Sequence, residues 1–84
     1  MEIREFCVPG YWSTIDTARI KLNARYFAFT KDQRMAYVSE DFDIWRLISE
    51  KVEKLPSGEI ASVHLVFTRI ARENLKPDSP INLL

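Results

Sequence analysis

The chain has 84 residues, which is enough for one small domain and too few for two. Twelve Lys and Arg residues balance twelve Asp and Glu residues, so the chain has no net charge to attract DNA, RNA or an anionic membrane over long range. Cys7 is the only cysteine, which excludes an intramolecular disulfide and a CxxC metal or redox motif. Packing alone therefore has to hold the fold.

The first residues, MEIREFCV, predict a short strand at the edge of a sheet. Charges at positions 2, 4 and 5 stand where a signal peptide needs its apolar region, and no apolar run approaches the length of a membrane span. We therefore expect a cytoplasmic protein with no membrane contact.

Residues 13–22 carry two competing patterns. The second half, ARIKL, alternates apolar and basic residues, which is typical of a strand with one buried face. At the start of the segment, Ser13 and Asp16 fit a helix capping box, and apolar residues also recur at helical spacing. The alternation favours a strand, and the helix remains the alternative.

The next segment, residues 25–38, has the pattern of a hairpin that turns at Asp32-Gln33. A two-residue turn there sets Phe29 opposite Ala36 and Phe27 opposite Val38. A second turn at residues 23–24 adds the strand before it to the same sheet. Both turns then predict one apolar face, made of Ala18, Ile20, Phe27, Phe29, Ala36 and Val38.

The opposite face of these three strands collects cations and tyrosines. A mixture of Arg and Tyr is enriched in protein interfaces, and the same residues can stack bases and hold phosphates. A solvated sheet face that binds nothing has a similar composition, so this third interpretation stays open. The residues predicted to bind a partner on this face are Arg19, Lys21, Tyr26, Met35 and Tyr37.

Residues 41–55 have the pattern of an amphipathic helix. Ser39 or Asp41 can cap its start, and Lys51 and Lys54 complement its negative end. The apolar residues cover a broad arc of the helix surface and predict its buried face. They are Phe42, Ile44, Trp45, Leu47, Ile48, Val52 and Leu55.

After a break at residues 56–58, the segment up to about residue 68 is rich in Val, Ile, Phe and Thr, which favours a strand over the alternative helix. Its alternation places Val63, Leu65 and Phe67 on one face. We expect residues 1–76 to form the domain and residues 77–84 an irregular tail, which either folds back or binds a partner.

These elements predict an α+β domain, with four to five antiparallel strands and one main amphipathic helix packed on one face of the sheet. Phe27, Phe29, Trp45 and Phe67 should fill the layer between helix and sheet, where each contributes about 1.5–3 kcal/mol.

The sequence carries no catalytic motif. His64 is the only histidine and nothing in the sequence brings it near Cys7, so a thiol enzyme is disfavoured. The acids Glu40, Asp41 and Asp43 lack the spacing and the glycine of a calcium loop, and Gly10 and Gly58 stand too far apart for a phosphate loop. We therefore expect no metal and no cofactor.

The sequence favours a small non-enzymatic binding protein that occupies a surface of a larger protein or protein–nucleic-acid complex. Such a protein would act as an inhibitor or accessory subunit, of the kind that phages and other mobile elements encode. The alternatives are a single-stranded nucleic-acid-binding module, which is less favoured, and a small enzyme that uses His64. A homodimer is left open.

Overall fold

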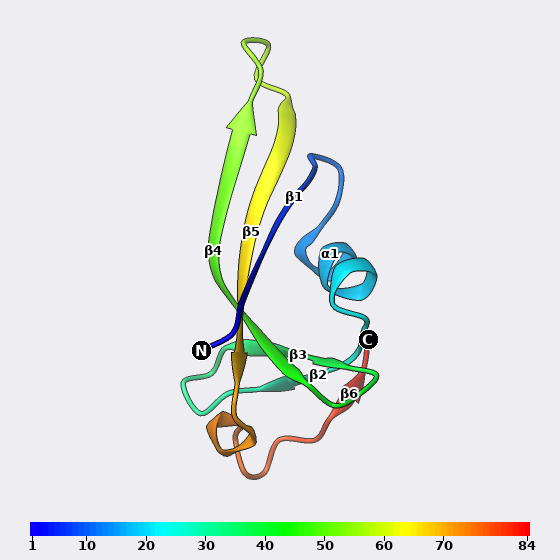
Figure 1. Ribbon diagram of the computed structural model, residues 1–84, viewed down its shortest axis with the longest axis vertical. Helices are drawn as coiled ribbons and strands as arrows, with labels where there is room; N and C mark the ends of the chain where they lie inside the picture. Colours follow the sequence, from blue (N-terminus) through cyan, green and yellow to red (C-terminus); the bar gives the residue numbers. More distant parts are fainter.

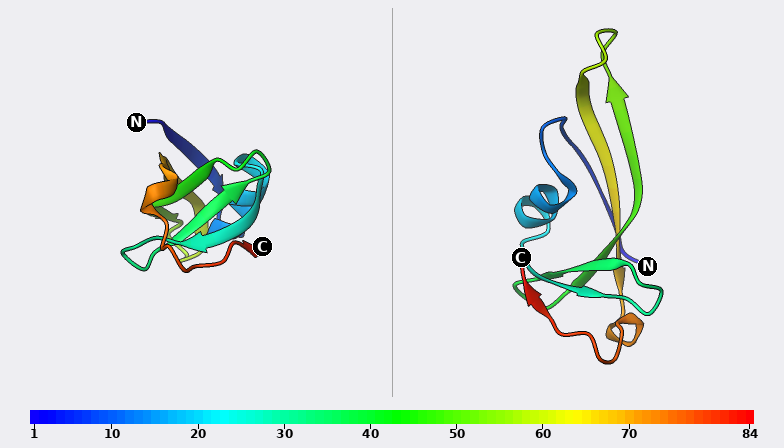
Figure 2. Two further views of the ribbon diagram at one scale, coloured as in Figure 1. Left: turned by 90° about the horizontal axis from the view of Figure 1, so that it is seen from below. Right: turned by 180° about the vertical axis from the view of Figure 1, so that it is seen from behind.

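The computed structural model describes all 84 residues and contains one antiparallel sheet, one α-helix and one 3-10 turn. The elements are β1 (Ile3–Pro9), α1 (Thr14–Lys21), β2 (Ala24–Phe29), β3 (Met35–Ser39), β4 (Ile44–Lys54), β5 (Ile60–Ile70), η1 (Arg72–Asn74) and β6 (Asn82–Leu83). The strand order is β1-β5-β4-β3-β2-β6, and the sheet is curled (Figures 1 and 2). The predicted α+β class is confirmed, with six strands in place of four or five.

The helix predicted over residues 41–55 is wrong, because Ile44–Lys54 form the long strand β4. In its pairing with β5, Ile48 is an extra residue between Leu47 and Ser49, and this bulge interrupts the alternation of side chains along β4. Apolar residues therefore do not recur at every second position. The resulting pattern imitates the spacing of a helix.

The only α-helix is α1, which covers residues predicted to be a strand, so the alternative interpretation is the right one. The N–H of Asp16 donates to Oγ of Ser13 and the N–H of Ser13 donates to Oδ2 of Asp16, both at 3.0 Å. This capping box starts the helix, and Asn23 in the left-handed region, with φ of 57°, follows its end. Ala18 is buried as expected, whereas Ile20 is exposed.

Three hairpin loops share one design. In each, two residues enclose a loop of three: the N–H of the first residue donates to the carbonyl of the fifth, and the N–H of the fourth donates to the carbonyl of the first. The fourth residue lies in the left-handed region: Gln33 with φ of 68°, Phe42 with 63° and Gly58 with 91°. A type I turn followed by such a residue is a common three-residue hairpin connection.

The three-residue loop shifts the β2–β3 register by one position from the predicted one. Phe27 lies opposite Tyr37 and Phe29 opposite Met35. One face of β3 is thereby exchanged for the other, because successive side chains point to opposite sides of the sheet. Tyr37 is buried at 6% exposure, while Phe29 is 40% exposed, the reverse of the predicted arrangement.

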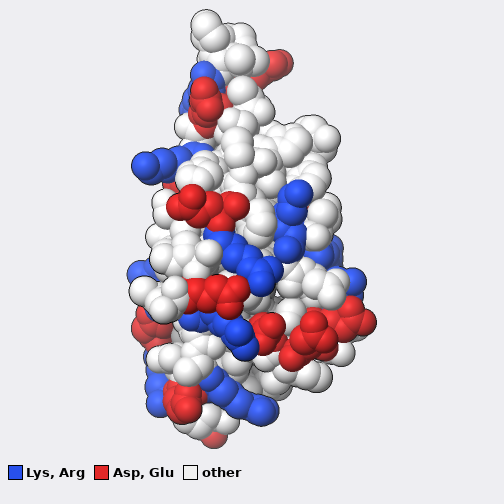
Figure 3. All heavy atoms as spheres, in the orientation of Figure 1, with Lys and Arg blue, Asp and Glu red and all other residues white.

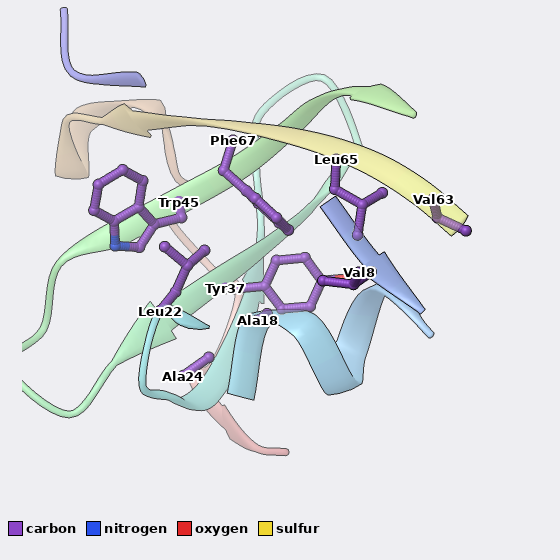
Figure 4. Close-up of a cluster of buried hydrophobic side chains, with 9 residues drawn as sticks. All are labelled: Val8, Ala18, Leu22, Ala24, Tyr37, Trp45, Val63, Leu65 and Phe67. Atoms are coloured by element: carbon purple, nitrogen blue, oxygen red, sulfur yellow. The ribbon is translucent and has the colours of Figure 1, made fainter. Parts of the chain in front are cut away.

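The main core fills the inner face of the curled sheet, against α1. Of the four aromatic residues predicted there, Trp45 and Phe67 are buried, whereas Phe27 is only partly so and Phe29 is exposed. Figure 4 shows the side chains of this cluster converging from α1 and from strands β1 to β5. Its members are Val8, Ala18, Leu22, Ala24, Tyr37, Trp45, Val63, Leu65 and Phe67.

A second, smaller cluster of Ala36, Val38 and Ile44 lies on the outer face of the sheet. Tyr26, Ile70 and Leu75 pack against it from β2, from β5 and from the segment after η1. The sheet is thus covered on both sides at its lower end in Figure 1. This explains why two successive residues of β4, Ile44 and Trp45, are both buried although their side chains point to opposite faces.

The C-terminal residues join the sheet. β6 pairs with β2, the N–H of Leu84 donates to the carbonyl of Arg25 at 2.9 Å, and the side chain of Leu84 packs against the main core. The segment expected to be irregular therefore contributes an edge strand. No helix in the structure is long and apolar enough to cross a membrane.

At the other end, residues 47–62 of the β4–β5 hairpin form an arm that extends past the helix (Figure 1). The molecule measures 45 × 21 × 20 Å, and every residue from Lys51 to Ile60 is exposed. Beside the arm, Gly10 lies so close to β5 that a Cβ there would overlap the carbonyl oxygen of Ile60. Glycine is needed at this contact.

Candidate partner-binding site

The structure does not bring the five predicted partner-binding residues together. Arg19 and Lys21 are exposed on α1, outside the sheet. Tyr37 is buried in the main core and Met35 packs against it. Tyr26 alone lies on the outer face, next to the second cluster. The predicted surface of cations and tyrosines is therefore not formed, because the predicted register and the predicted first strand are both wrong.

A different feature stands out on the outer face, where a hollow of about 510 Å³ lies between the β3–β4 loop and the C-terminal segment. A volume of this size is within the range of ligand pockets. Seven of the eleven lining residues are hydrophobic, and polar and apolar atoms contribute nearly equal parts of the lining surface. The hollow is lined by Glu2, Val38, Phe42, Asp43, Ile44, Arg69, Ile70, Ala71, Arg72, Leu75 and Ile81.

The hollow is preformed by the packing of the chain. Val38 and Ile44 of the second cluster contribute to its lining from the sheet, and Leu75 is contributed by the segment after η1. That segment is fixed to the β2–β3 hairpin, where the N–H of Lys31 donates to the carbonyl of Asn74 at 2.9 Å and the N–H of Lys76 to the carbonyl of Phe29 at 2.8 Å. No rearrangement is needed to create the hollow.

Phe42 is the most unusual residue of the hollow. It occupies the left-handed position of the β3–β4 loop, which favours glycine, and it is 65% exposed. Its ring stacks on that of Tyr26, with centroids 6.0 Å apart and an interplanar angle of 6°. The sequence pattern predicts Phe42 on a buried helix face, which is wrong. The signal that would have corrected it is the short polar segment SEDFD, in which an isolated Phe stands among acids.

Charged residues form the rim of the hollow and are mostly paired with one another. Nη2 of Arg69 lies 2.6 Å from Oδ1 of Asp43, and its Nη1 lies 3.4 Å from Oε1 of Glu2. The hydrogen bond that the Arg4 side chain donates to Glu2 holds the pKa of that carboxyl below its usual value of 4.5. Arg72 is exposed and makes no ion pair.

The face of the molecule that Figure 3 shows is of mixed sign. Figure 3 shows basic and acidic side chains interspersed along the molecule, and none of the five ion pairs is isolated from water. Long-range attraction to a polyanion is not provided on this face.

Cys7 and His64 lie directly opposite each other in the β1–β5 pair. No sequence pattern indicated this proximity, and Cys7 is exposed. Both residues alternate with core residues and therefore lie on the outer face, and neither lines any of the three surface hollows. The two side chains are neighbours, but they do not converge in a cleft.

No protein-family model, no curated protein and no solved structure matches this chain.

Proposed function

We propose that this protein is a non-enzymatic binding protein that occupies a surface of a larger protein or protein–nucleic-acid complex, as an inhibitor or accessory subunit, and that it binds through the hollow at Phe42. The observation that carries the proposal is an exposed aromatic residue held in a conformation that favours glycine, beside a hollow that is already formed and is lined mostly by hydrophobic residues.

The conformation of Phe42 has an energetic cost. A non-glycine residue in the left-handed region is disfavoured by roughly 1–2 kcal/mol. Stacking on Tyr26 returns about 0.5–1.5 kcal/mol, which is of similar size, so the aromatic pair gives the fold little net stability. Backbone strain of this kind is concentrated at functional sites, and Phe42 has most of its ring surface left to contribute to an interface.

The chemistry of the hollow defines the partner it would accept. Its seven hydrophobic lining residues fit a large aliphatic or aromatic side chain, inserted between Phe42 and Ile81. Arg72, which has no ion pair, favours an acidic group next to that side chain. The partner is therefore a protein that presents an apolar anchor flanked by Asp or Glu.

The lining residues support binding over catalysis. Both carboxylates, Glu2 and Asp43, are held by Arg69, and neither a histidine nor a cysteine nor a serine lines the hollow. General acid–base or nucleophilic chemistry requires such groups to be free to transfer a proton or attack a substrate.

Single-stranded nucleic acid is the second candidate, because the exposed ring of Phe42 beside Arg72 offers a surface for stacking a base. Three acids in the same loop, Glu40, Asp41 and Asp43, would repel the phosphates. If nucleic acid is the partner, binding weakens steeply as salt rises. If the partner is a protein with an apolar anchor, its affinity should be nearly independent of salt concentration.

A site-specific photo-crosslinker tests the proposal in cells of the source organism. The photoreactive phenylalanine analogue benzoyl-phenylalanine replaces Phe42 in one strain and, as the matched control, Phe29 in another. Phe29 is also an exposed phenylalanine but does not line the hollow. Position 42 is expected to give a discrete adduct that protease removes and nuclease does not, and position 29 none.

The same adduct from both positions, or an adduct that only nuclease removes, would contradict the proposal. Once the crosslinked protein is identified, Phe42→Ala should weaken its affinity at least about tenfold, as expected for a central aromatic anchor. Phe29→Ala should leave the affinity unchanged.

A further inference from the structure

The outer edge of β4 is free along the arm. β4 pairs with β3 only through residues 44–46, whereas its pairing with β5 continues as far as residue 54. Figures 1 and 2 show this edge of the arm open on the side away from β5. A free edge of this length can pair with another extended strand.

Two hydrogen bonds show which amide groups of β5 face β1. The N–H of Arg69 donates to the carbonyl of Glu2 at 2.9 Å, and the N–H of Gly10 donates to the carbonyl of Ala61 at 3.3 Å. The register between these two bonds is unbroken, so odd-numbered residues of β5 direct their backbone groups to β1. The even-numbered residues from 62 onward direct theirs to β4.

The register of the β4–β5 pair transfers this alternation to β4. Residues 62, 64 and 66 of β5 lie opposite residues 53, 51 and 49, which therefore hydrogen-bond within the hairpin. The N–H and C=O groups of Glu50 and Val52 consequently point outward, where no strand of the chain meets them. Those of Lys54 also point outward, because the next residue, Leu55, donates its N–H to the carbonyl of Glu59 within the hairpin.

The side chains of this edge are complementary to a second copy of themselves. In an antiparallel pair of two copies centred on Val52, Glu50 lies opposite Lys54 of the second copy and Lys51 opposite Glu53. None of these four charged residues makes an ion pair within the chain. Val52, which is 44% exposed, would lie on the two-fold axis.

The neighbouring registers lack this complementarity. Centring the pair on residue 50, 51, 53 or 54 sets a charged residue opposite itself, which is unfavourable. The register centred on Val52 pairs the outward-facing amides of the two copies with each other. Among these registers, it alone does so without setting like charges opposite each other.

We propose that two copies of this chain form a homodimer by antiparallel pairing of residues 50–54 of β4, about a two-fold axis at Val52. One pair of short strands buries less surface than the roughly 1,200 Å² of a stable interface, so the dimer is weak and depends on protein concentration. The two hollows remain free, because each lies at the end of β5 that is remote from the arm.

Charge exchange tests the register of the dimer. Glu50→Lys sets two lysines against each other at two symmetric positions of the dimer, and Lys54→Glu does the same with two glutamates. Sedimentation equilibrium should show that either variant raises the dissociation constant about tenfold, whereas the double variant E50K/K54E returns it to that of the wild type. An equimolar mixture of the two single variants should form a heterodimer.

A wild-type chain that stays monomeric at millimolar concentration would overturn the proposal. So would a dimer whose dissociation constant is unaffected by either single variant, because another edge such as β1 would then be the interface. Thermal unfolding of each variant in dilute solution is the control for folding, and no change is expected because both side chains are accessible to water.

Discussion

Phe42 and Gln33 occupy the same position in two loops of the same design, which allows the strain at Phe42 to be measured against a matched residue. Gln33→Gly should raise the free energy of unfolding by about 0.5–1 kcal/mol, because the relief of left-handed strain exceeds the added flexibility of glycine in the unfolded chain. Urea denaturation measures the difference.

Phe42→Gly should raise the free energy of unfolding by less than Gln33→Gly does, or not at all, because it also removes the stacking on Tyr26. Its effect on partner affinity should nevertheless be large. A strong loss of stability in Phe42→Gly would show instead that Phe42 serves the fold, and would weaken its assignment to the binding site.

Tyr37 and Phe29 test the register of the β2–β3 hairpin. Tyr37→Ala should lower the free energy of unfolding by about 3–5 kcal/mol, because it leaves a cavity in the main core next to Phe67. Phe29→Ala should cost less than about 1.5 kcal/mol, since Phe29 is 40% exposed, lies outside the main core and makes an edge contact with Phe27. Equal losses in thermal melts of the two variants would contradict the observed register.

At the scale of the elements, the capping box of α1 predicts a dependence of stability on pH. The backbone N–H of Ser13 donates to Asp16 and holds the pKa of that carboxyl below its usual value of 3.8. A pKa that is lower in the folded state than in the unfolded state stabilises the fold at pH values above 3.8. This contribution is lost as the pH falls through the lowered pKa.

The free energy of unfolding should therefore fall further in the wild type than in Asp16→Asn when the pH is lowered from about 6 to about 2. The other two carboxyls with lowered pKa values, Glu2 and Asp32, are present in both proteins, so the difference isolates Asp16. Ser13→Ala should cost about 1 kcal/mol at neutral pH. Parallel pH profiles for wild type and Asp16→Asn would argue against the cap.

Among the elements, β5 could be predicted from the sequence because Val63, Leu65 and Phe67 alternate without a bulge and are all buried on one face. β4 could not, because its bulge at Ile48 interrupts the alternation and because Ile44 and Trp45 are covered from opposite sides of the sheet. The local pattern of β4 predicts a helix, and tertiary packing makes it a strand instead.

The hairpin loops are the main reason why the candidate site could not be predicted from the sequence. Loops of three residues contain a left-handed residue, and only the one at Gly58 has the glycine that signals it. Without that signal, the sequence predicts a two-residue turn at Gln33 and a helix at Phe42. Tyr26 is the one predicted site residue that touches the candidate site, through its stack with Phe42.

On the scale of the whole molecule, β5 links two surfaces with separate roles. Its first residues form the arm, and its last residues, Arg69 and Ile70, line the hollow. The proposed dimer and the proposed partner site therefore do not compete. If the partner protein is itself symmetric, a dimer that presents two hollows binds it more tightly than a monomer through multivalency.

The central claim is that the hollow at Phe42 is the partner-binding surface, and isoleucine methyl groups report on it directly. Ile44, Ile70 and Ile81 line the hollow, whereas Ile48 and Ile60 lie on the arm. Methyl NMR spectra of the protein should be recorded during titration with the partner protein that the crosslinking experiment identifies. The concentrations should be low enough for the chain to be monomeric. We predict that the signals of Ile44, Ile70 and Ile81 shift while those of the arm do not, and shifts confined to Ile48 and Ile60 would contradict the claim.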